Sequence, residues 1–183
     1  MPGLHRIILI NCHLPGFVEL DVSGHSNICG TNASGKTTLQ RLIPVFYGEL
    51  PSKVVPKTRK KFDDFYLPHA NSYLIYEYQR EDGQDCQVVL TRKGSDGVQY
   101  RFVEAPYHQE QILVDVEKGN VQAMLPEQWI KQLRQLGIEF SHKIQATSEF
   151  RNIIQNDVSV DLGAGRDSTK YRQLASRYSL VSS

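Results

Sequence analysis

The chain has 183 residues, of which 40% are hydrophobic and 22% charged, a composition typical of a folded protein rather than a disordered or collagen-like chain. Lysine and arginine total 21 against 20 acidic residues, so a net charge of +1 gives no global field for attracting nucleic acid or a membrane. The three cysteines are widely spaced, the histidines show no metal-ligand pattern, and no apolar run is long enough to span a bilayer. We therefore expect a cytoplasmic protein of one ordinary domain, with reduced thiols and no membrane partner.

The N-terminal segment predicts a β-hairpin followed by a short strand. Residues 6–14 are apolar and β-branched, Pro15-Gly16 marks a turn, and residues 17–22 alternate between apolar and polar. Residues 26–29 are again β-prone and lead directly into a glycine-rich loop.

A helix is expected after that loop, and a long connection after the helix. Apolar residues recur at helical spacing until Gly48, and Pro44 predicts an irregular last turn because proline removes a hydrogen bond. Residues 51–69 carry three prolines and a basic cluster without a clean period. This pattern predicts a long loop, of the kind that is often functional.

An antiparallel β-meander is predicted in the middle of the chain. Residues 72–80, 86–93 and 98–105 are rich in β-formers and are separated by turn signals that contain glycine. Residues 111–119 are compatible with a fourth strand.

The C-terminal part predicts two helices joined by a strand. Residues 126–137 place apolar residues on one helical face, with Trp129 expected to contact the sheet. Residues 138–145 look like a strand, and Thr147 is positioned to cap the helix that follows. The tail, residues 157–183, is polar and weakly patterned.

Residues 30–37 match the phosphate-loop pattern G-x-x-x-x-G-K-[ST] without a mismatch, between a predicted strand and a predicted helix. Glycines let the backbone curl so that successive N–H groups point at phosphate oxygens, and the helix N-terminus adds partial positive charge. We expect Lys36 to bridge the β and γ phosphates of ATP and Thr37 to bind Mg²⁺ through its hydroxyl group. The expected nucleotide-binding residues are Gly30, Thr31, Asn32, Ala33, Ser34, Gly35, Lys36, Thr37 and Thr38.

The segment GTNASGKTTLQRLIPVFYGE, residues 30–49, resembles the ATP-binding head of the SMC family (structural maintenance of chromosomes), whose loops carry an asparagine where Asn32 stands. The match is closer to a bacterial group of large SMC-like ATPases, related to condensins and plasmid-defence complexes, that pairs a GKT loop with a downstream YLP, here Tyr66-Leu67-Pro68. The resemblance covers residues 4–156 in order of elements. It implies that residues 1–156 form a mixed α/β, ABC-type half-domain, with an N-terminal hairpin, a strand–phosphate-loop–helix unit and a β-meander. The tail would then lead toward an absent coiled coil.

In such heads a strand ends in a glutamine that contacts Mg²⁺ and the attacking water, and the resemblance assigns this role to Gln145; the alternative is an ordinary exposed glutamine. The acidic pair that activates water has no convincing counterpart, since Asp115 is followed by Val116. The signature motif is also missing, because residues 162–166 imitate it poorly. The resemblance therefore implies a lobe that hydrolyses ATP only when completed by a C-terminal head lobe and a second head, which dimerises with it when ATP is bound.

Alternative interpretations remain open at this point. The basic residues between Lys53 and Lys61 form either a DNA-binding loop or a solvated surface. A self-sufficient phosphate-loop kinase would use Asp115 or Asp64 as its acid and the arginines of the tail as a lid, but the β-meander argues against that class. A nucleotide-gated interaction module that never hydrolyses ATP is the third possibility.

Overall fold

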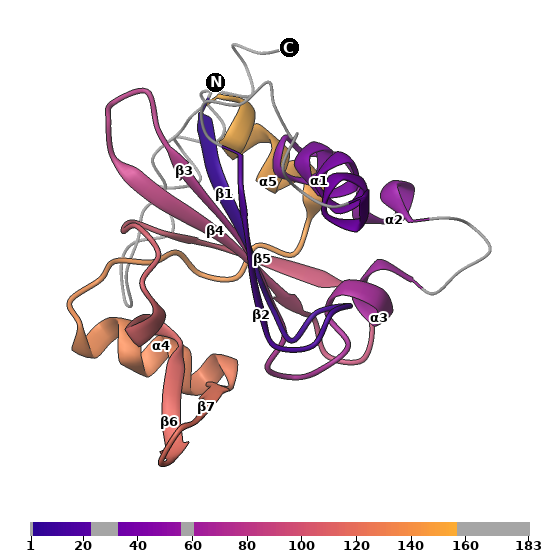
Figure 1. Ribbon diagram of the computed structural model, residues 1–183. Helices are drawn as coiled ribbons and strands as arrows, with labels where there is room; N and C mark the ends of the chain where they lie inside the picture. Colours follow the sequence, from indigo (N-terminus) through magenta and orange to yellow (C-terminus); the bar gives the residue numbers. More distant parts are fainter. Residues whose placement is uncertain (1, 23–32, 56–60, 157–183) are drawn as a thin grey trace.

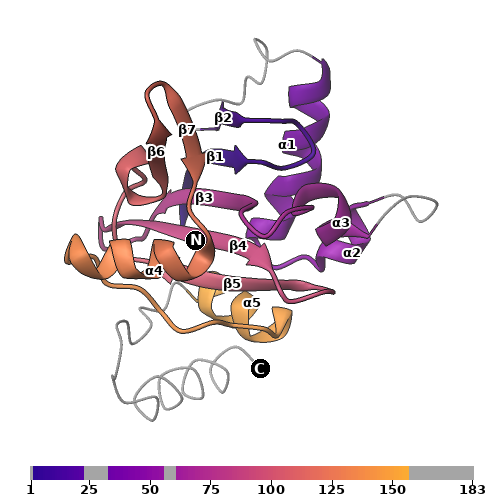
Figure 2. The same ribbon diagram turned by 90° about the horizontal axis from the view of Figure 1, so that it is seen from below.

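A five-stranded antiparallel sheet forms the centre of the computed structural model, which describes residues 2–22, 33–55 and 61–156 (Figures 1 and 2). In spatial order its strands are β2 (Phe17–Asp21), β1 (Gly3–Ile10), β3 (Tyr73–Gln79), β4 (Asp85–Arg92) and β5 (Val98–Val103). The protein is therefore a mixed α and β fold built on antiparallel pairing.

Both predicted antiparallel units are confirmed. β1 and β2 form the N-terminal hairpin, whose connection is closed by a 3.0 Å hydrogen bond from the Asn11 amide to the Gly16 carbonyl. β3, β4 and β5 form the meander. The two units join because β1 also pairs with β3, with Ile10 opposite Tyr73. The strand predicted at residues 26–29 lies outside the described residues.

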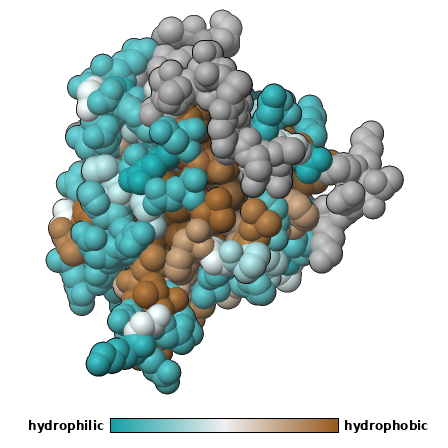
Figure 3. Space-filling model, in the orientation of Figure 1, coloured by the Kyte–Doolittle hydropathy of each residue, from teal (hydrophilic) through white to brown (hydrophobic). Residues whose placement is uncertain are grey.

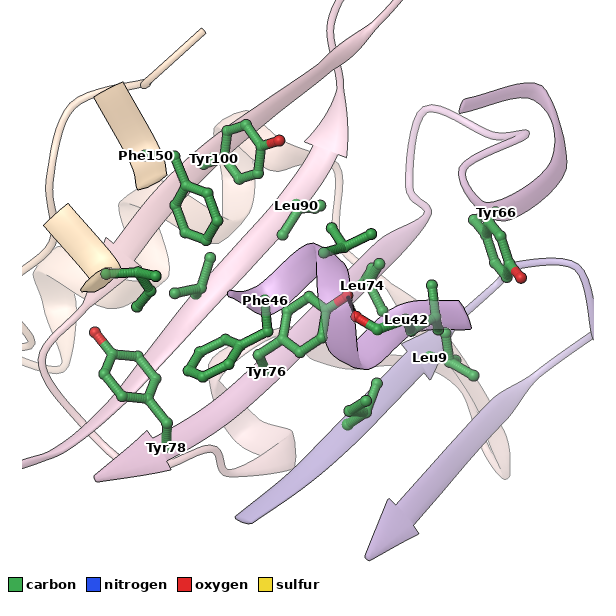
Figure 4. Packing of buried hydrophobic residues seen from close by; sticks show 14 of the residues in the cluster. Leu9, Leu42, Phe46, Tyr66, Leu74, Tyr76, Tyr78, Leu90, Tyr100 and Phe150 are labelled. Atoms are coloured by element: carbon green, nitrogen blue, oxygen red, sulfur yellow. Dashed lines mark hydrogen bonds between the residues drawn. The ribbon is translucent and has the colours of Figure 1, made fainter. Parts of the chain in front are cut away.

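Helices cover one face of the sheet: α1 (Ala33–Phe46), α2 (Pro51–Val54), α3 (Phe62–Tyr66) and α5 (Thr147–Gln155). Their apolar side chains join those of the strands in one buried cluster, part of which Figure 4 shows. Phe150 of α5 stacks on Tyr100 of β5 with ring centroids 4.3 Å apart. Burial of large aromatic groups on this face fixes the helices against the strands.

A second layer covers the other face. It contains a short 3₁₀ turn η1 (Gln109–Gln111), the strands β6 (Leu113–Glu117) and β7 (Asn120–Ala123), and helix α4 (Pro126–Gln135). Trp129 of α4 is buried and meets the Tyr73 ring edge-on, which confirms the predicted contact between helix and sheet. The predicted fourth strand exists as β6, but it pairs with β7 in a separate two-stranded sheet instead of extending the meander.

The strand predicted at residues 138–145 is wrong as a regular element. Only two isolated bridges form, Val103 with Phe140 and Tyr100 with Ile144. Between them the Ser141 hydroxyl accepts a 2.9 Å hydrogen bond from the amide of Phe102. A side chain thus takes the position that a main-chain carbonyl occupies in a continuous ladder.

The predicted cap of α5 is also wrong. Thr147 is the first residue of the helix and Ala146 precedes it in an extended conformation, without a capping side chain. The Thr147 hydroxyl lies 3.1 Å from the hydroxyl of Tyr100 instead. Because Ala146 holds the N-cap position, the Thr147 side chain is one residue too late to cap the helix.

The segment that follows α1 is more regular than its composition indicates. Residues 51–69 contain α2 and α3, while residues 56–60 lie outside the described part. Pro51 begins α2, a position where its fixed φ is already helical and its missing N–H costs nothing.

The end of α1, where Pro44 predicts an irregular turn, is a glycine cap. Pro44 lies inside the helix, and the amide of Tyr47 bonds to the Pro44 carbonyl at 3.1 Å. The amide of Gly48 bonds to the Val45 carbonyl in the same three-residue spacing. The amide of Glu49 also bonds to the Pro44 carbonyl at 3.0 Å, so the helix ends in the common pattern that has a left-handed glycine after it.

Cys12 and Cys86 are free, buried thiols. Burial raises the pKa of each thiol to about 12. Both cysteines behave as small apolar core residues, as expected of reduced thiols.

Candidate functional site

The second half of the phosphate-loop motif forms the first turn of α1. Gly30, Thr31 and Asn32 lie outside the described residues, and the helix begins at Ala33. Lys36 and Thr37 are exposed on this turn. The motif therefore opens a helix, as the sequence predicted.

The N-terminal end of α1 carries the partial positive charge of a helix terminus. The first N–H groups of a helix lack acceptors within the helix and carry partial positive charge. No acidic residue occupies the first turn of α1, so no carboxylate side chain there competes with an incoming phosphate. The ammonium group of Lys36 adds a full positive charge next to these amides.

The remaining turns of α1 hold this end in place. Leu39, Leu42, Val45 and Phe46 are buried against the sheet. The Tyr76 hydroxyl of β3 donates a 2.7 Å hydrogen bond to the Leu42 carbonyl, which Figure 4 shows as a dashed line. This fixed apolar face leaves Lys36, Thr37 and Gln40 on the solvent side.

Gln145 lies elsewhere. It directly precedes α5 and lines a cavity of about 460 Å³ together with residues of α2, α3 and the turn between β4 and β5. Among the described residues that line this cavity, none belongs to α1. Figure 2 shows α1 beginning beside the β2 edge of the sheet and α5 lying at the β5 edge. The structure thus brings Lys36 and Thr37 together and does not bring Gln145 to them; a shared Mg²⁺ stays a prediction.

Tyr66-Leu67-Pro68 acts as a packing element at the end of α3. Tyr66 and Leu67 are buried, and the guanidinium of Arg92 donates 3.2 Å hydrogen bonds to the carbonyls of Asp63 and Leu67. The same guanidinium pairs with the Asp64 carboxylate at 2.9 Å. Asp64, a candidate acid of the kinase alternative, therefore forms an ion pair with Arg92.

The other candidate acid, Asp115, is also separated from the motif. It lies on β6 opposite Val121, is exposed, and belongs to the separate two-stranded sheet. The described ranges contain no group of three or more His, Cys, Asp or Glu residues that could hold a metal ion. The poor signature imitation at residues 162–166 lies outside these ranges.

The basic segment between α1 and α3 is described only at its ends. Lys53 lies 3.8 Å from the Glu49 carboxylate, four residues earlier, and Lys61 lies 3.1 Å from that of Asp96. These exposed pairs hold the two lysines only weakly. Residues 56–60, which include Lys57, Arg59 and Lys60, lie outside the described part.

Among the described residues, β2 is an edge strand of the sheet. On its outer side no described strand pairs with it. Leu14, in the turn before β2, and Phe17, its first residue, are each 43% exposed. Figure 3, which views the molecule from this edge, shows a continuous apolar strip down the middle of this face. Unpaired edges and contiguous apolar surface are typical of a site that another polypeptide covers. No helix in the described ranges has the length and apolar character needed to cross a membrane.

The chain matches one known protein family. The model of a family described as a protein of unknown function (DUF3584) matches residues 8–183, so the chain belongs to this family. No curated protein matches the chain.

Proposed function

We propose that this member of the DUF3584 family is an ATP–Mg²⁺-binding lobe of an SMC-like ATPase that acts on DNA. It binds the nucleotide through residues 30–38 and hydrolyses it only when a C-terminal head lobe and a second head complete the site. The observation that carries the proposal is the unbroken phosphate-loop motif whose second half opens α1, with Lys36 and Thr37 exposed in the first turn.

Phosphoryl transfer requires electrostatic stabilisation of the γ-phosphate from several sides. Within the described residues the acids predicted as alternatives are unsuited to that task, because Asp64 is paired with Arg92 and Asp115 lies on the β6–β7 hairpin. A lobe that binds ATP and waits for catalytic groups from another polypeptide accounts for this arrangement.

A self-sufficient kinase is less well supported. Kinases with a phosphate loop place parallel strands and covering helices after the first helix, whereas this chain continues into an antiparallel meander. The β2 edge of the described sheet and the apolar strip beside it support a docking site for another head lobe. Both features favour a part of a larger machine.

The test is equilibrium binding of a fluorescent ATP analogue to the 183-residue chain, with and without Mg²⁺. Lys36→Ala removes a charge-assisted contact to phosphate, and such contacts are worth about 1.5–3 kcal/mol, so we expect a loss of affinity of about tenfold or more. Gln40→Ala is the matched control, because Gln40 is exposed on the same helix one turn later and lies outside the motif. Equal affinity of the Lys36→Ala and Gln40→Ala variants would refute the nucleotide site.

Phosphate release separates the remaining alternatives. The proposal expects little ATP turnover by the chain alone. Robust phosphotransfer by the isolated chain to a small molecule would favour the kinase instead. Unchanged nucleotide occupancy in the presence of a completing head lobe, without any hydrolysis, would favour the interaction module.

A further inference from the structure

Several positively charged side chains line a groove beside α4, and none of them belongs to the proposed phosphate loop. The groove has a volume of about 890 Å³, and its cationic lining consists of Arg92, Arg101, Lys131, Arg134 and Lys143; Glu127 is the acidic residue of the described lining. We refer to it as the α4 groove. The protein as a whole has a net charge of only +1, so this concentration is a local property.

The four cations of the groove other than Arg92 come from three segments of the chain. Lys131 and Arg134 lie three residues apart on α4, Arg101 comes from β5, and Lys143 comes from the extended segment after α4. A 2.8 Å hydrogen bond from the Ser141 amide to the Phe102 carbonyl fixes the segment after α4 against β5. A 2.9 Å bond from the Ile138 amide to the Leu133 carbonyl joins the same segment to α4. The charges are therefore carried by a fixed framework.

The cations of the groove differ in how they are compensated. Arg92 is neutralised by Asp64 and Asp63, at 2.9 and 3.6 Å. Arg101, Lys131, Arg134 and Lys143 form no ion pair with a carboxylate in the part of the chain that the structure describes. Four positive charges thus face the groove with Glu127 as the described counter-charge.

Two of these arginines are also held in position. An Arg101 guanidinium nitrogen donates a 3.0 Å hydrogen bond to the Ser141 carbonyl, and the guanidinium carbon of Arg134 lies 5.5 Å from the centre of the Phe140 ring. Burial, with a smaller contribution from the charge of Arg134, lowers the pKa of Arg101 below its usual value. An anion bound in the groove would offset the repulsion between the positive charges of Arg101 and Arg134.

We propose that the α4 groove binds the phosphate groups of a nucleic-acid backbone. The choice of nucleic acid over another polyanion rests on the proposed DNA-acting ATPase. No aromatic side chain is among the described residues that line the groove, so there is no platform for stacking bases. Binding is therefore independent of base sequence and sensitive to salt.

The test is fluorescence anisotropy with a labelled duplex of about 20 base pairs, without nucleotide or Mg²⁺, at about 50 and about 200 mM NaCl. Lys131→Glu combined with Lys143→Glu reverses two exposed charges in the groove and is expected to weaken binding at least about tenfold. The slope of log affinity against log salt should fall by about 1 for each lysine replaced. Arg134→Gln removes one positive charge and should also weaken binding, but less than the double variant.

Two controls carry the same kinds of charge change outside the groove. Lys118→Glu lies in the turn between β6 and β7 and should leave the affinity within about twofold of the wild type. Lys53→Glu combined with Lys61→Glu matches the double variant and tests the basic segment before α3. If the second pair abolishes binding and the groove pair does not, the α4 groove is not the site.

Competitors identify the ligand class. Tripolyphosphate should displace the duplex only at much higher concentration, because a free phosphate chain spans few of the contacts. Polyglutamate that displaces the duplex equally well at equal charge would assign the groove to an acidic protein and overturn the proposal, as would a duplex that does not bind.

Lys36→Ala separates this inference from the proposed function. This variant should bind the duplex with wild-type affinity and bind ATP with reduced affinity. If the wild type binds the duplex but not ATP, the nucleotide site is refuted and the groove is not. If it binds ATP but not the duplex, the groove is refuted and the nucleotide site is not.

Discussion

Arg151 of α5 donates a hydrogen bond from Nε to the carbonyl oxygen of Gly48, 2.9 Å away. Gly48 directly follows the last turn of α1 and has a φ of +102°. A Cβ atom at this position would lie 2.6 Å from Cγ of Arg151. The absence of a side chain at Gly48 therefore allows α1 and α5 to meet on one face of the sheet.

Gly48→Ala should destabilise the fold for two reasons. A positive φ costs an L-residue about 1–2 kcal/mol, and Arg151 must also move away from the new methyl group. Gly83→Ala is the matched control, since Gly83 has a φ of +90° but a methyl group added there would meet no other atom within 4 Å. We expect urea denaturation to show a larger loss for Gly48→Ala than for Gly83→Ala; equal losses would show that the contact with Arg151 is unimportant.

The Arg6–Glu77 pair predicts how stability depends on pH. Nε of Arg6 lies 2.8 Å from one carboxylate oxygen of Glu77 and a second nitrogen lies 2.9 Å from the other. Burial raises the pKa of Glu77, but the hydrogen bonds from Arg6 and from the amide of Tyr107 outweigh it and lower the pKa below its usual value. The folded state thus favours the carboxylate more than the unfolded chain does.

The corresponding contribution to the free energy of unfolding is complete above the unfolded pKa of about 4.3 and is lost as the pH falls through the lower folded value. Glu77→Gln should therefore show a shallower loss of stability than the wild type below about pH 4.3 in urea titrations. Arg6→Gln should flatten the curve in the same way, and combining the two changes should add little. A wild-type slope in Glu77→Gln would contradict this role.

Metal dependence distinguishes Thr37 from Gln145. Thr37→Ala should remove most of the gain in ATP affinity that Mg²⁺ provides, because a hydroxyl ligand is lost. Gln145→Ala should leave the ATP affinity of the isolated chain unchanged, since Gln145 lines the cavity at the β5 edge. Binding titrations at several Mg²⁺ concentrations measure both effects. Equal losses in the two variants would show that Gln145 reaches the nucleotide in solution.

Local sequence patterns predicted which segments form helices and strands better than they predicted how these elements pair and pack. The alternation in β2 reports which side of that strand is buried, whereas the meander was predicted from its β-forming residues and glycine turns, since β3 and β4 are buried on both faces. The helical spacing of Leu39, Leu42 and Phe46 predicts α1. The pairing of β1 with β3 joins residues far apart in the chain, and no local pattern records it. The strand predicted at 138–145 failed because the Ser141 hydroxyl competes for the Phe102 amide.

The candidate sites show the same limit. Lys36 and Thr37 were predictable because a contiguous motif fixes their position at the start of a helix. The charges of the α4 groove were missed, because Arg101 and Lys143 approach α4 only through tertiary contacts. The spacing of Lys131 and Arg134 on the polar face of one helix was the available local signal.

The two interior cysteines are protected from chemical labelling in the folded protein. With their pKa near 12 and their sulfur atoms enclosed, Cys12 and Cys86 hold almost no reactive thiolate at neutral pH. Labelling of Cys12 and Cys86 by a maleimide dye therefore requires the protein to unfold around them.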